Sequence, residues 1–156
     1  QEQMENKQAD KMRSLQDFAF SLGEGTVILG SDTVVAADGK ILGKPKSHEE
    51  AYEMIRRLAG RSHQVYTGVC IVKKGPEGEA DTVVSFYDET DVNVSPMTEK
   101  EIREYADSEE PMDKAGSYAV QGFFARYIDG LKGSYANVMG LPVHLVYQEL
   151  KKLGAL

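Results

Sequence analysis

Apolar-rich stretches separated by turn-forming residues run along this chain, and several of them are typical of strands. The two longest are joined by a segment rich in glycine and proline, residues 75–78, which predicts a solvent-exposed turn. Asp38-Gly39 follows a shorter apolar run and is a strong hairpin signal. The expected strands cover residues 26–29, 64–73, 82–94, 117–121 and 123–128.

Helices are predicted where apolar positions recur at helical spacing behind a capping residue. Ser47 with Glu50 and Thr98 with Glu101 have the spacing of capping boxes, and each pair precedes such a stretch. Gly60 stands where a glycine is expected after the end of the first of these helices. A last helix opens at Leu141-Pro142 and is expected to bury Val143, Val146, Leu150 and Leu153.

This mixture predicts an α/β fold, and 156 residues are enough for one domain with a single sizeable core. The hydrophobic fraction of 41% and the charged fraction of 28% are ordinary for a globular protein. No apolar run approaches the roughly 18 residues that a membrane span needs, so no membrane partner is expected. A single cysteine, Cys70, excludes an internal disulfide and fits a reducing cytoplasm. Cys70 lies in an apolar run, so its side chain is expected to be buried.

The formal net charge of −7 argues against a nucleic-acid polymer as partner, because binding to a polyanion depends on basic patches. A small nucleotide is not excluded, since a few local cations and a metal ion can neutralise its charge. His48, His63 and His144 are scattered without the spacing of metal ligands, so a structural zinc site is not expected.

Asp32 and Lys44 are the first residues for which a reaction can be argued. Asp32 follows the apolar run 27–29 and Gly30, so it is expected where a strand leaves the core, a usual ligand-binding position in open α/β sheets. The hairpin at Asp38-Gly39 is expected to bring Lys44 back toward Asp32. A carboxylate near an ammonium group suits a metal-bound anion, because the carboxylate can hold the metal or take a proton while the lysine neutralises phosphate charge. From position alone, Asp32 could equally make a local turn or capping bond.

Five short motifs follow one another from about Leu29 to the C-terminus. They are Ser31-Asp32-Thr33-Val34-Val35, Gly43-Lys44-Pro45, Pro111-Met112-Asp113-Lys114-Ala115-Gly116-Ser117-Tyr118, Gln121-Gly122 and Asn137-Val138-Met139-Gly140-Leu141-Pro142. Each motif alone is weak evidence, but in this order and spacing they resemble the Maf (septum-formation-inhibitor) family of nucleoside triphosphate pyrophosphatases. The resemblance implies a Maf/inosine-triphosphatase-like fold, an elongated mixed α/β sheet with flanking helices, in a single domain over residues 1–156.

The resemblance also implies a catalytic role for Asp32, because the active-site aspartate of the family occupies this place in the motif. Cleavage between the α- and β-phosphates needs an activated water molecule and neutralisation of negative charge. Asp32 can accept a proton from the water, or it can hold a divalent cofactor, Mg²⁺ or Mn²⁺, that acidifies the water. The sequence leaves both roles open.

Lys44 and Lys114 are candidates for binding the phosphates of the substrate. Lys44 stands between Gly43 and Pro45, which restrict its backbone, and the family lysine of this motif contacts the substrate. Lys114 precedes Ala115-Gly116, two small residues that allow a ligand to approach the backbone closely. A solvated surface lysine is the ordinary alternative for both positions.

Thr33 and Gln121 are candidates for recognising the base. A glutamine amide offers a donor and an acceptor, which match the imide edge of uracil or thymine, whereas a polar residue at a strand end is the alternative. Asp-Thr and Gln-Gly at these two places resemble the dTTP/UTP pyrophosphatase subgroup. The subgroup that acts on 7-methyl-GTP carries Gln after the aspartate and Glu before the glycine. Either Ser134 or Asn137 is expected to cap a helix, in preference to contacting a ligand.

The chain departs from the family at its N-terminus. Family members open with a strand and a Ser-x-Ser-Pro-Arg-Arg loop that supplies a phosphate-binding arginine, and this chain has no such segment. Residues 4–20 predict a helix that would follow the missing part, and Lys11 is matched to a further family lysine. The resemblance therefore implies an N-terminally incomplete domain and weak or absent activity for the chain as it stands.

The sequence thus predicts a cytoplasmic enzyme that hydrolyses dTTP, UTP and related pyrimidine nucleotides to the monophosphate and pyrophosphate. Family members often dimerise, so the resemblance allows a homodimer, although nothing in this sequence fixes the oligomeric state. Two alternatives stay open: a non-hydrolysing nucleotide-binding module that regulates cell division, and a purine-specific pyrophosphatase of related fold. Gln121 argues against the second.

Overall fold

The structure is a computed structural model, and it describes residues 13–14, 17–18 and 22–156. The four described residues before position 22 are helical, in agreement with the helix expected over residues 4–20. The other residues of this predicted range, with Lys11, lie outside the described residues.

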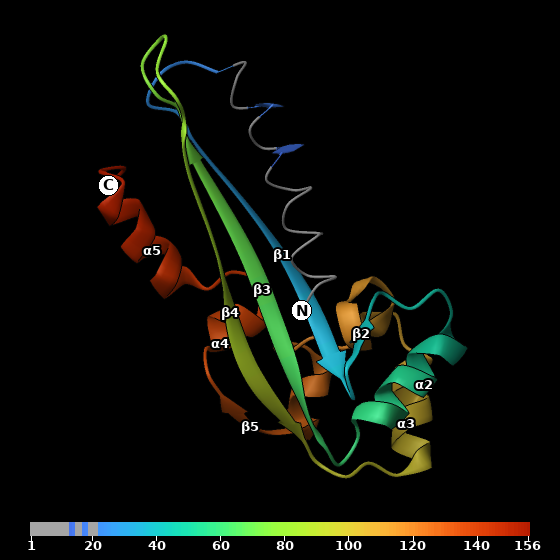
Figure 1. Cartoon of the computed structure of the whole chain (residues 1–156). Helices are drawn as coiled ribbons and strands as arrows, with labels where there is room; N and C mark the ends of the chain where they lie inside the picture. Colours follow the sequence, from blue (N-terminus) through green and yellow to red (C-terminus); the bar gives the residue numbers. More distant parts are fainter. Residues whose placement is uncertain (1–12, 15–16, 19–21) are drawn as a thin grey trace. The chain divides into compact units, whose positions relative to one another are not determined.

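Five strands form a sheet in the order β2-β1-β3-β4-β5, and helices accompany it, so the predicted α/β class is confirmed (Figure 1). The pairings at the two edges of the sheet, β1 with β2 and β4 with β5, are antiparallel. The strands are β1 (Val27–Ala37), β2 (Lys40–Leu42), β3 (Ser62–Lys73), β4 (Thr82–Val94) and β5 (Ile128–Lys132). The α-helices are α2 (His48–Leu58), α3 (Glu99–Ala106), α4 (Tyr135–Val138) and α5 (Val143–Lys152). The 3₁₀ helices are η1 (Glu110–Asp113), η2 (Ala115–Ser117) and η3 (Phe123–Tyr127).

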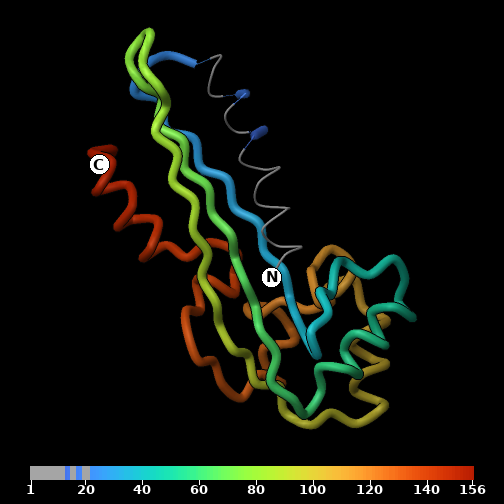
Figure 2. The backbone as a smooth tube through the Cα atoms, viewed as in Figure 1, coloured from blue at the N-terminus to red at the C-terminus, as the bar shows by residue number. Residues whose placement is uncertain are grey.

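The chain divides into two compact units, and the long strands β1, β3 and β4 contribute residues to both. Unit 1 comprises Gln1–Asp32, Thr67–Asp88 and Gly140–Leu156, and unit 2 comprises Thr33–Tyr66 and Glu89–Met139. Figure 2 shows how β3 runs into β4 through the turn at residues 74–81, which belongs to unit 1. Residues 76–80 of this turn are exposed, as predicted.

Unit 1 has an apolar cluster on each face of its β3 segment. Val69 and Ile71 pack with Val146 of α5 in one cluster, whereas Cys70 and Val72 form the other. Residues 69–72 are all buried because successive side chains of a strand point to opposite faces and both faces are covered. Cys70 is buried as expected, and this burial raises the pKa of its thiol.

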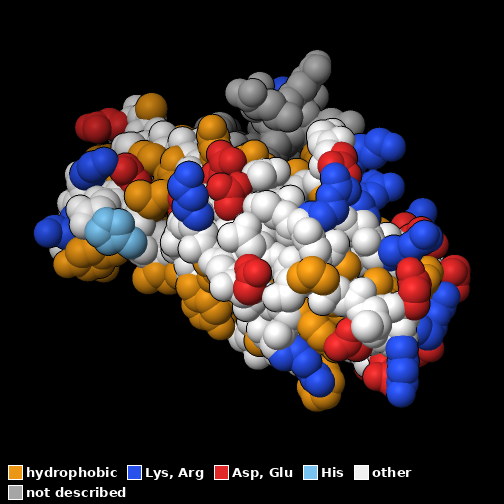
Figure 3. Space-filling view, turned by 90° about the horizontal axis from the view of Figure 1, so that it is seen from below, with side chains coloured by type: hydrophobic (Ala, Val, Ile, Leu, Met, Phe, Trp, Pro, Cys, Tyr) orange, Lys and Arg blue, Asp and Glu red, His pale blue; other side chains and the backbone are white. Residues whose placement is uncertain are grey.

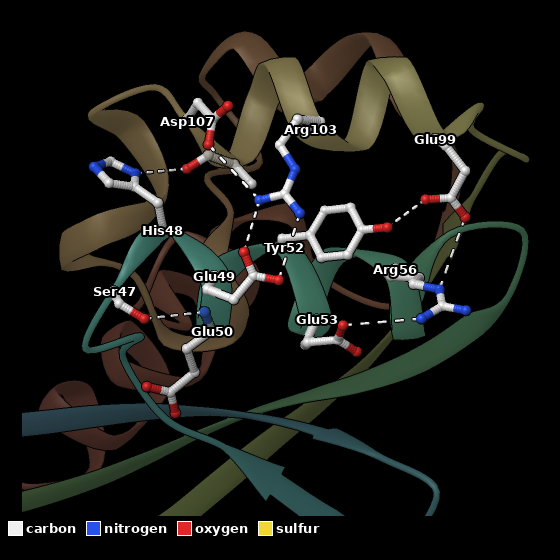
Figure 4. A network of polar contacts seen from close by, with 11 residues as sticks. Ser47, His48, Glu49, Glu50, Tyr52, Glu53, Arg56, Glu99, Arg103 and Asp107 are labelled. Carbon is white, nitrogen blue, oxygen red and sulfur yellow. Dashed lines mark hydrogen bonds and ion pairs between the residues drawn. The ribbon is translucent and has the colours of Figure 1, made fainter.

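Unit 2 holds the largest core cluster, in which α2 and α3 contribute Ile55, Leu58, Ile102 and Tyr105. The two helices are also joined on their exposed side by a polar network (Figure 4). The guanidinium of Arg103 donates to both carboxylate oxygens of Glu49, at 2.9 and 3.4 Å, and lies 3.8 Å from the ring centroid of Tyr52. The phenol of Tyr52 donates to Glu99.

The capping predictions are confirmed at α3 and in part at α2. Thr98 and Glu101 form a reciprocal capping box, with the Thr98 amide donating to the Glu101 carboxylate at 2.7 Å. At α2, the Ser47 hydroxyl accepts from the Glu50 amide, but the Glu50 carboxylate accepts from the Lys46 amide instead of that of Ser47. The α2 box is therefore only half formed.

Gly60 and the hairpin turn have the backbone conformations that the sequence predicts. Gly60 follows α2 with a φ of +69°, a left-handed conformation that favours glycine. Asp38 and Gly39 have φ values of +51° and +72°, the signs that a two-residue type I′ turn requires. This turn sets the register in which Val35 pairs with Leu42.

Strand β1 is longer than expected, and this changes the position of Asp32. The apolar run predicted a strand ending at residue 29, but Gly30 continues the strand, which ends only at Ala37. Asp32 therefore lies in the middle of a strand and not where a strand leaves the core. Glycine weakens a strand without necessarily ending it, and β1 here continues beside its long neighbour β3 until it reaches the residues 35–37 that pair with β2.

Two predicted short strands are wrong, and one helix face is only partly correct. Ser117 ends η2, residues 118–121 form no strand but lead into a turn at 120–121, and residues 123–127 form η3, so only β5 remains as a strand in this region. The 3₁₀ conformation of η3 depends on hydrogen bonds from the amides of Phe123 and Phe124 to Glu110, which a local pattern does not show.

In α5, Val146 is buried and Leu150 and Leu153 pack in its cluster, but Val143 is exposed. No helix among the described residues has the length and apolar character needed to cross a membrane.

Candidate functional site

The loops that carry Lys44 and Lys114 are joined by a backbone hydrogen bond. Strand β2 ends at Leu42, and the carbonyl oxygen of the next residue, Gly43, accepts from the amide of Gly116 at 3.1 Å. Lys44 follows Gly43 directly, and Lys114 lies two residues before Gly116. The structure therefore brings together the two lysines that the sequence proposed for phosphate binding.

Gly116 fixes the position of the Lys114 loop against the sheet. A Cβ atom at Gly116 would lie 2.8 Å from Cγ1 of Val35 on β1, and the φ of Gly116 is +68°. The next residue, Ser117, also has a positive φ of +64° and is fully buried, with its hydroxyl 3.0 Å from the sulfur of Met54. Only a residue without a side chain fits this approach, which explains the glycine of the motif.

The charges of both lysines act on one carboxylate, Asp113. The ammonium group of Lys114 forms an ion pair with Asp113 at 2.5 Å. The hydrogen bond from Lys114 lowers the pKa of Asp113, and the positive charges of Lys114 and Lys44 lower it further. An anion at this place is therefore stabilised by two cations from separate loops.

Gln121 lies on a different turn of unit 2. The amide of Gly122 donates to the carbonyl of Ala119 at 3.2 Å, which closes a turn with Val120 and Gln121 at its centre. The Gln121 side chain is exposed, and its amide has no hydrogen-bond partner among the residues that the structure describes. Gln121 is thus placed to offer its donor and acceptor to a ligand.

Asp32 and Thr33 are consecutive residues of β1, and both are half-buried. Asp32 is the last residue of the unit 1 part of the strand, and Thr33 is the first of the unit 2 part. In unit 1, the hydroxyl of the neighbouring Ser31 donates to the carbonyl of Gly140 at 3.1 Å, which ties the strand to the segment before α5. In unit 2, Thr33 shares a strand face with Val35, against which Gly116 packs.

Asp32 is the carboxylate among the candidate residues that a divalent metal ion could use. Among the described residues, no three or more histidine, cysteine, aspartate or glutamate side chains gather as a metal-binding group. Mg²⁺ is commonly held by one or two carboxylates, with phosphate oxygens and water completing its six ligands. Asp32 supplies one such carboxylate, so the residues present suit a metal–nucleotide complex and not a dedicated protein cage.

The Gly133–Asn137 segment has a structural role that the sequence only partly predicted. Ser134 caps α4, since its hydroxyl accepts from the Asn137 amide at 3.2 Å, as expected for one of these two residues. Asn137 is fully buried, and its side chain donates to the carbonyl of Val65 on β3 and to the hydroxyl of Thr90 on β4. These bonds fasten α4 to the sheet, a role that becomes visible only once β3 and β4 are paired.

Comparisons with known proteins agree with the motifs. The model of the family described as "Maf-like protein" matches residues 2–153. The dTTP/UTP pyrophosphatase of Lachnoclostridium phytofermentans is 47% identical over 138 residues, covering 88% of this chain and 70% of that protein. The dTTP/UTP pyrophosphatase of Agathobacter rectalis is 52% identical over 131 residues, covering 82% of this chain and 62% of that protein. The dTTP/UTP pyrophosphatase of Carboxydothermus hydrogenoformans is 46% identical over 139 residues, covering 89% of this chain and 72% of that protein. The chain thus spans about two thirds of the length of these relatives.

Proposed function

Because the chain belongs to the Maf-like protein family, we propose that it hydrolyses dTTP, UTP and related pyrimidine nucleotides to the monophosphate and pyrophosphate. The observation that carries this proposal is the bond between Gly43 and Gly116, which brings the Lys44 and Lys114 loops together. Two lysines on adjoining loops suit a ligand with several adjacent negative charges, such as a triphosphate chain.

In the proposed reaction, a water molecule attacks the α-phosphorus, and the bond from that phosphorus to the oxygen bridging the α- and β-phosphates breaks. Pyrophosphate leaves with the electron pair of the broken bond. Lys44 and Lys114 neutralise the charge that grows on the leaving group, because a cation near a developing oxyanion lowers the barrier most where water is excluded.

Asp32 accepts the proton of the attacking water, or its carboxylate would hold the divalent ion that acidifies this water. A positioned carboxylate can do either, and in both roles its negative charge is essential. Mg²⁺ or Mn²⁺, when bound with the nucleotide, would be held by the Asp32 carboxylate and would neutralise phosphate charge and acidify water.

Base choice is assigned to Gln121 and Thr33. The Gln121 amide can donate to a carbonyl of uracil or thymine and accept from the imide N–H, whereas adenine and cytosine present their donor and acceptor in the opposite order. We also propose a cytoplasmic location, because the single cysteine, Cys70, is buried as an apolar residue and forms no disulfide.

The alternative of a non-hydrolysing regulatory module is not favoured, since the most similar relatives reported above are named as pyrophosphatases. A purine-specific enzyme of related fold remains a distinct outcome of the selectivity measurement. It would show a higher kcat/KM for GTP or ITP than for UTP.

The proposed function is tested by measuring pyrophosphate release from UTP and dTTP with Mg²⁺ present. Asp32→Asn keeps the shape of the side chain but removes its charge, and should lower kcat by about 10²–10⁴, the usual contribution of a positioned acid–base group. Asp129→Asn is the matched control, because Asp129 is an exposed aspartate on β5 whose loss should leave kcat unchanged. Unaltered turnover by a folded Asp32→Asn protein would exclude the assigned role.

A further inference from the structure

Glu110 is a half-buried glutamate at the start of η1 whose carboxylate accepts three hydrogen bonds. One oxygen, Oε2, accepts from the amide of Phe123 at 2.7 Å. The other, Oε1, accepts from the amide of Phe124 at 3.2 Å and from the phenol of Tyr105 at 2.9 Å. Burial raises the pKa of Tyr105, as does its hydrogen bond to Glu110, so this phenol stays protonated as a donor.

These bonds hold the turn that presents Gln121. Phe123 and Phe124 follow Gln121 by two and three residues, and both of their amides are bound to Glu110. Between them and Gln121 stands Gly122, where a Cβ atom would lie 2.5 Å from the carboxyl carbon of Glu110. The backbone after Gln121 is therefore pressed against the carboxylate, and its position depends on Glu110.

The chemistry of the contact requires a carboxylate. Both oxygens face N–H or O–H donors, and an ionised carboxylate accepts at both without donating. A glutamine in the same place would turn an N–H group toward at least one of these donors, so one bond would be replaced by a repulsive contact between two donors.

We propose that Glu110 is a positioning residue for base selection: it fixes the Gln121 turn, and preference for pyrimidine nucleotides depends on it although it touches no ligand. This inference rests on the proposed function, in which Gln121 recognises the base. A glutamine amide can distinguish bases only if its donor and acceptor are held in place, because a mobile amide can pair with either kind of edge.

The test is to measure the dissociation constants of the non-hydrolysable α,β-methylene analogues of UTP and ATP with Mg²⁺, together with KM and kcat for UTP. Glu110→Gln should reduce the preference for the uridine analogue about tenfold, the effect of one misplaced hydrogen bond, and raise the KM for UTP with kcat within about twofold. Glu104→Gln is the control. Glu104 and Glu110 both line a cavity of about 300 Å³ beside Phe123 and Arg126, but the carboxylate of Glu104 pairs with Lys100.

A second pair of variants keeps the test decisive if Glu110→Gln does not fold. Phe123→Pro removes the amide that donates to Oε2, and residue 123 is the first residue of η3, where proline is tolerated. Phe123→Ala removes the same ring, which stacks on Arg126, but keeps the amide. Loss of preference in Phe123→Pro but not in Phe123→Ala supports the proposal, and equal behaviour of the two variants contradicts it.

The role of Glu110 must also be coupled to that of Gln121. In a Gln121→Ala background, Glu110→Gln should change the preference between the two analogues by less than about twofold. If Gln121→Ala weakens the preference while Glu110→Gln leaves it intact, the inference about Glu110 is wrong and the role of Gln121 stands. If UTP is bound but no pyrophosphate is released, the proposed function fails, whereas the binding constants still decide the role of Glu110.

Discussion

At the scale of single residues, the most unusual group is His63, a histidine on β3 that is 1% exposed. Its Nε2 atom is hydrogen-bonded to the hydroxyl of Tyr118 at 2.7 Å, and the two rings pack edge to face with centroids 5.3 Å apart. Burial lowers the pKa of His63 to about 4, and the negative charge of Asp91 opposes this shift only in part. The imidazole is therefore neutral in the folded protein at pH values where an unfolded chain would bind a proton.

This difference predicts a loss of stability in mild acid. The unfolded chain takes up a proton at His63 near pH 6.5, whereas the folded protein does so near pH 4. The free energy of unfolding should thus be unaffected by His63 above pH 6.5 and fall by about 1.4 kcal/mol per pH unit between these values, levelling off below pH 4. Chemical denaturation of the protein and of His63→Gln across this range measures the effect.

The comparison between the two proteins removes the contribution of the acidic residues, which titrate in both. The stability difference between them should change by up to about 3 kcal/mol in favour of the variant as the pH falls from 6.5 to 4. If the free energy of unfolding of the two proteins changed in parallel with pH, His63 could be protonated in the folded protein without loss of stability.

At the scale of elements, Gly116 holds η2 against β1 and with it the Lys114 loop. Gly116→Ala introduces two separate costs, because φ is +68° and the new Cβ would meet Val35 at 2.8 Å. Gly39 in the β1–β2 turn has a similar φ of +72° but open space around its Cα, so Gly39→Ala isolates the cost of the backbone conformation.

We expect Gly39→Ala to lower the free energy of unfolding by about 1 kcal/mol and Gly116→Ala to lower it by about 2–4 kcal/mol. Only Gly116→Ala should also raise the KM for UTP, because it displaces the loop that carries Lys114. Denaturant unfolding and steady-state kinetics measure both effects. Equal stability of the two variants would mean that Val35 yields without cost, and an unchanged KM in Gly116→Ala would separate Lys114 from substrate binding.

The elements that the sequence predicted well are those whose signals are local. The capping box at Thr98 and the Asp38-Gly39 turn each depend on residues within four positions of one another, and both formed as expected. The elements it missed depend on contacts distant in sequence. Residues 123–127 form a 3₁₀ helix because Glu110 binds two of their amides from 13 and 14 residues away. A run such as Phe123-Phe124 carries no sign of that bond.

The same distinction applies to the site. The motifs identified Lys44, Lys114 and Gln121, but the bond between Gly43 and Gly116 that joins the two lysine loops spans 73 residues and has no local signal. Nothing local in the sequence indicates the role of Glu110, since a glutamate shortly after a helix is ordinarily solvated. The role proposed for Glu110 rests on its half-buried position and on three hydrogen-bond donors, which only the folded chain provides.

At the scale of the whole molecule, charge distinguishes a nucleotide site from a nucleic-acid surface. The chain carries 25 acidic and 18 basic residues. On the face shown in Figure 3, lysine and arginine side chains are interspersed with aspartate and glutamate and form no continuous basic patch. Cations gather locally instead, as at the Lys44 and Lys114 loops, where two lysines lower the pKa of Asp113.

This distribution predicts that the protein binds a triphosphate but not a polynucleotide. Non-specific binding to DNA or RNA comes from many phosphate contacts that release condensed counterions, and a net charge of −7 opposes the approach of such a polymer. At about 50 mM salt, where this attraction is strong, we expect no retardation of duplex DNA or single-stranded RNA in a gel at protein concentrations up to about 100 μM.

In the same buffer, the α,β-methylene analogue of UTP should bind. Its affinity should fall only weakly between about 50 and 200 mM salt, because two lysines bind it and a single nucleotide carries no layer of condensed counterions. Retention of the polymer, or a steep loss of analogue binding with salt, would mean that an extended basic surface exists and that the local pair of lysines does not account for anion binding.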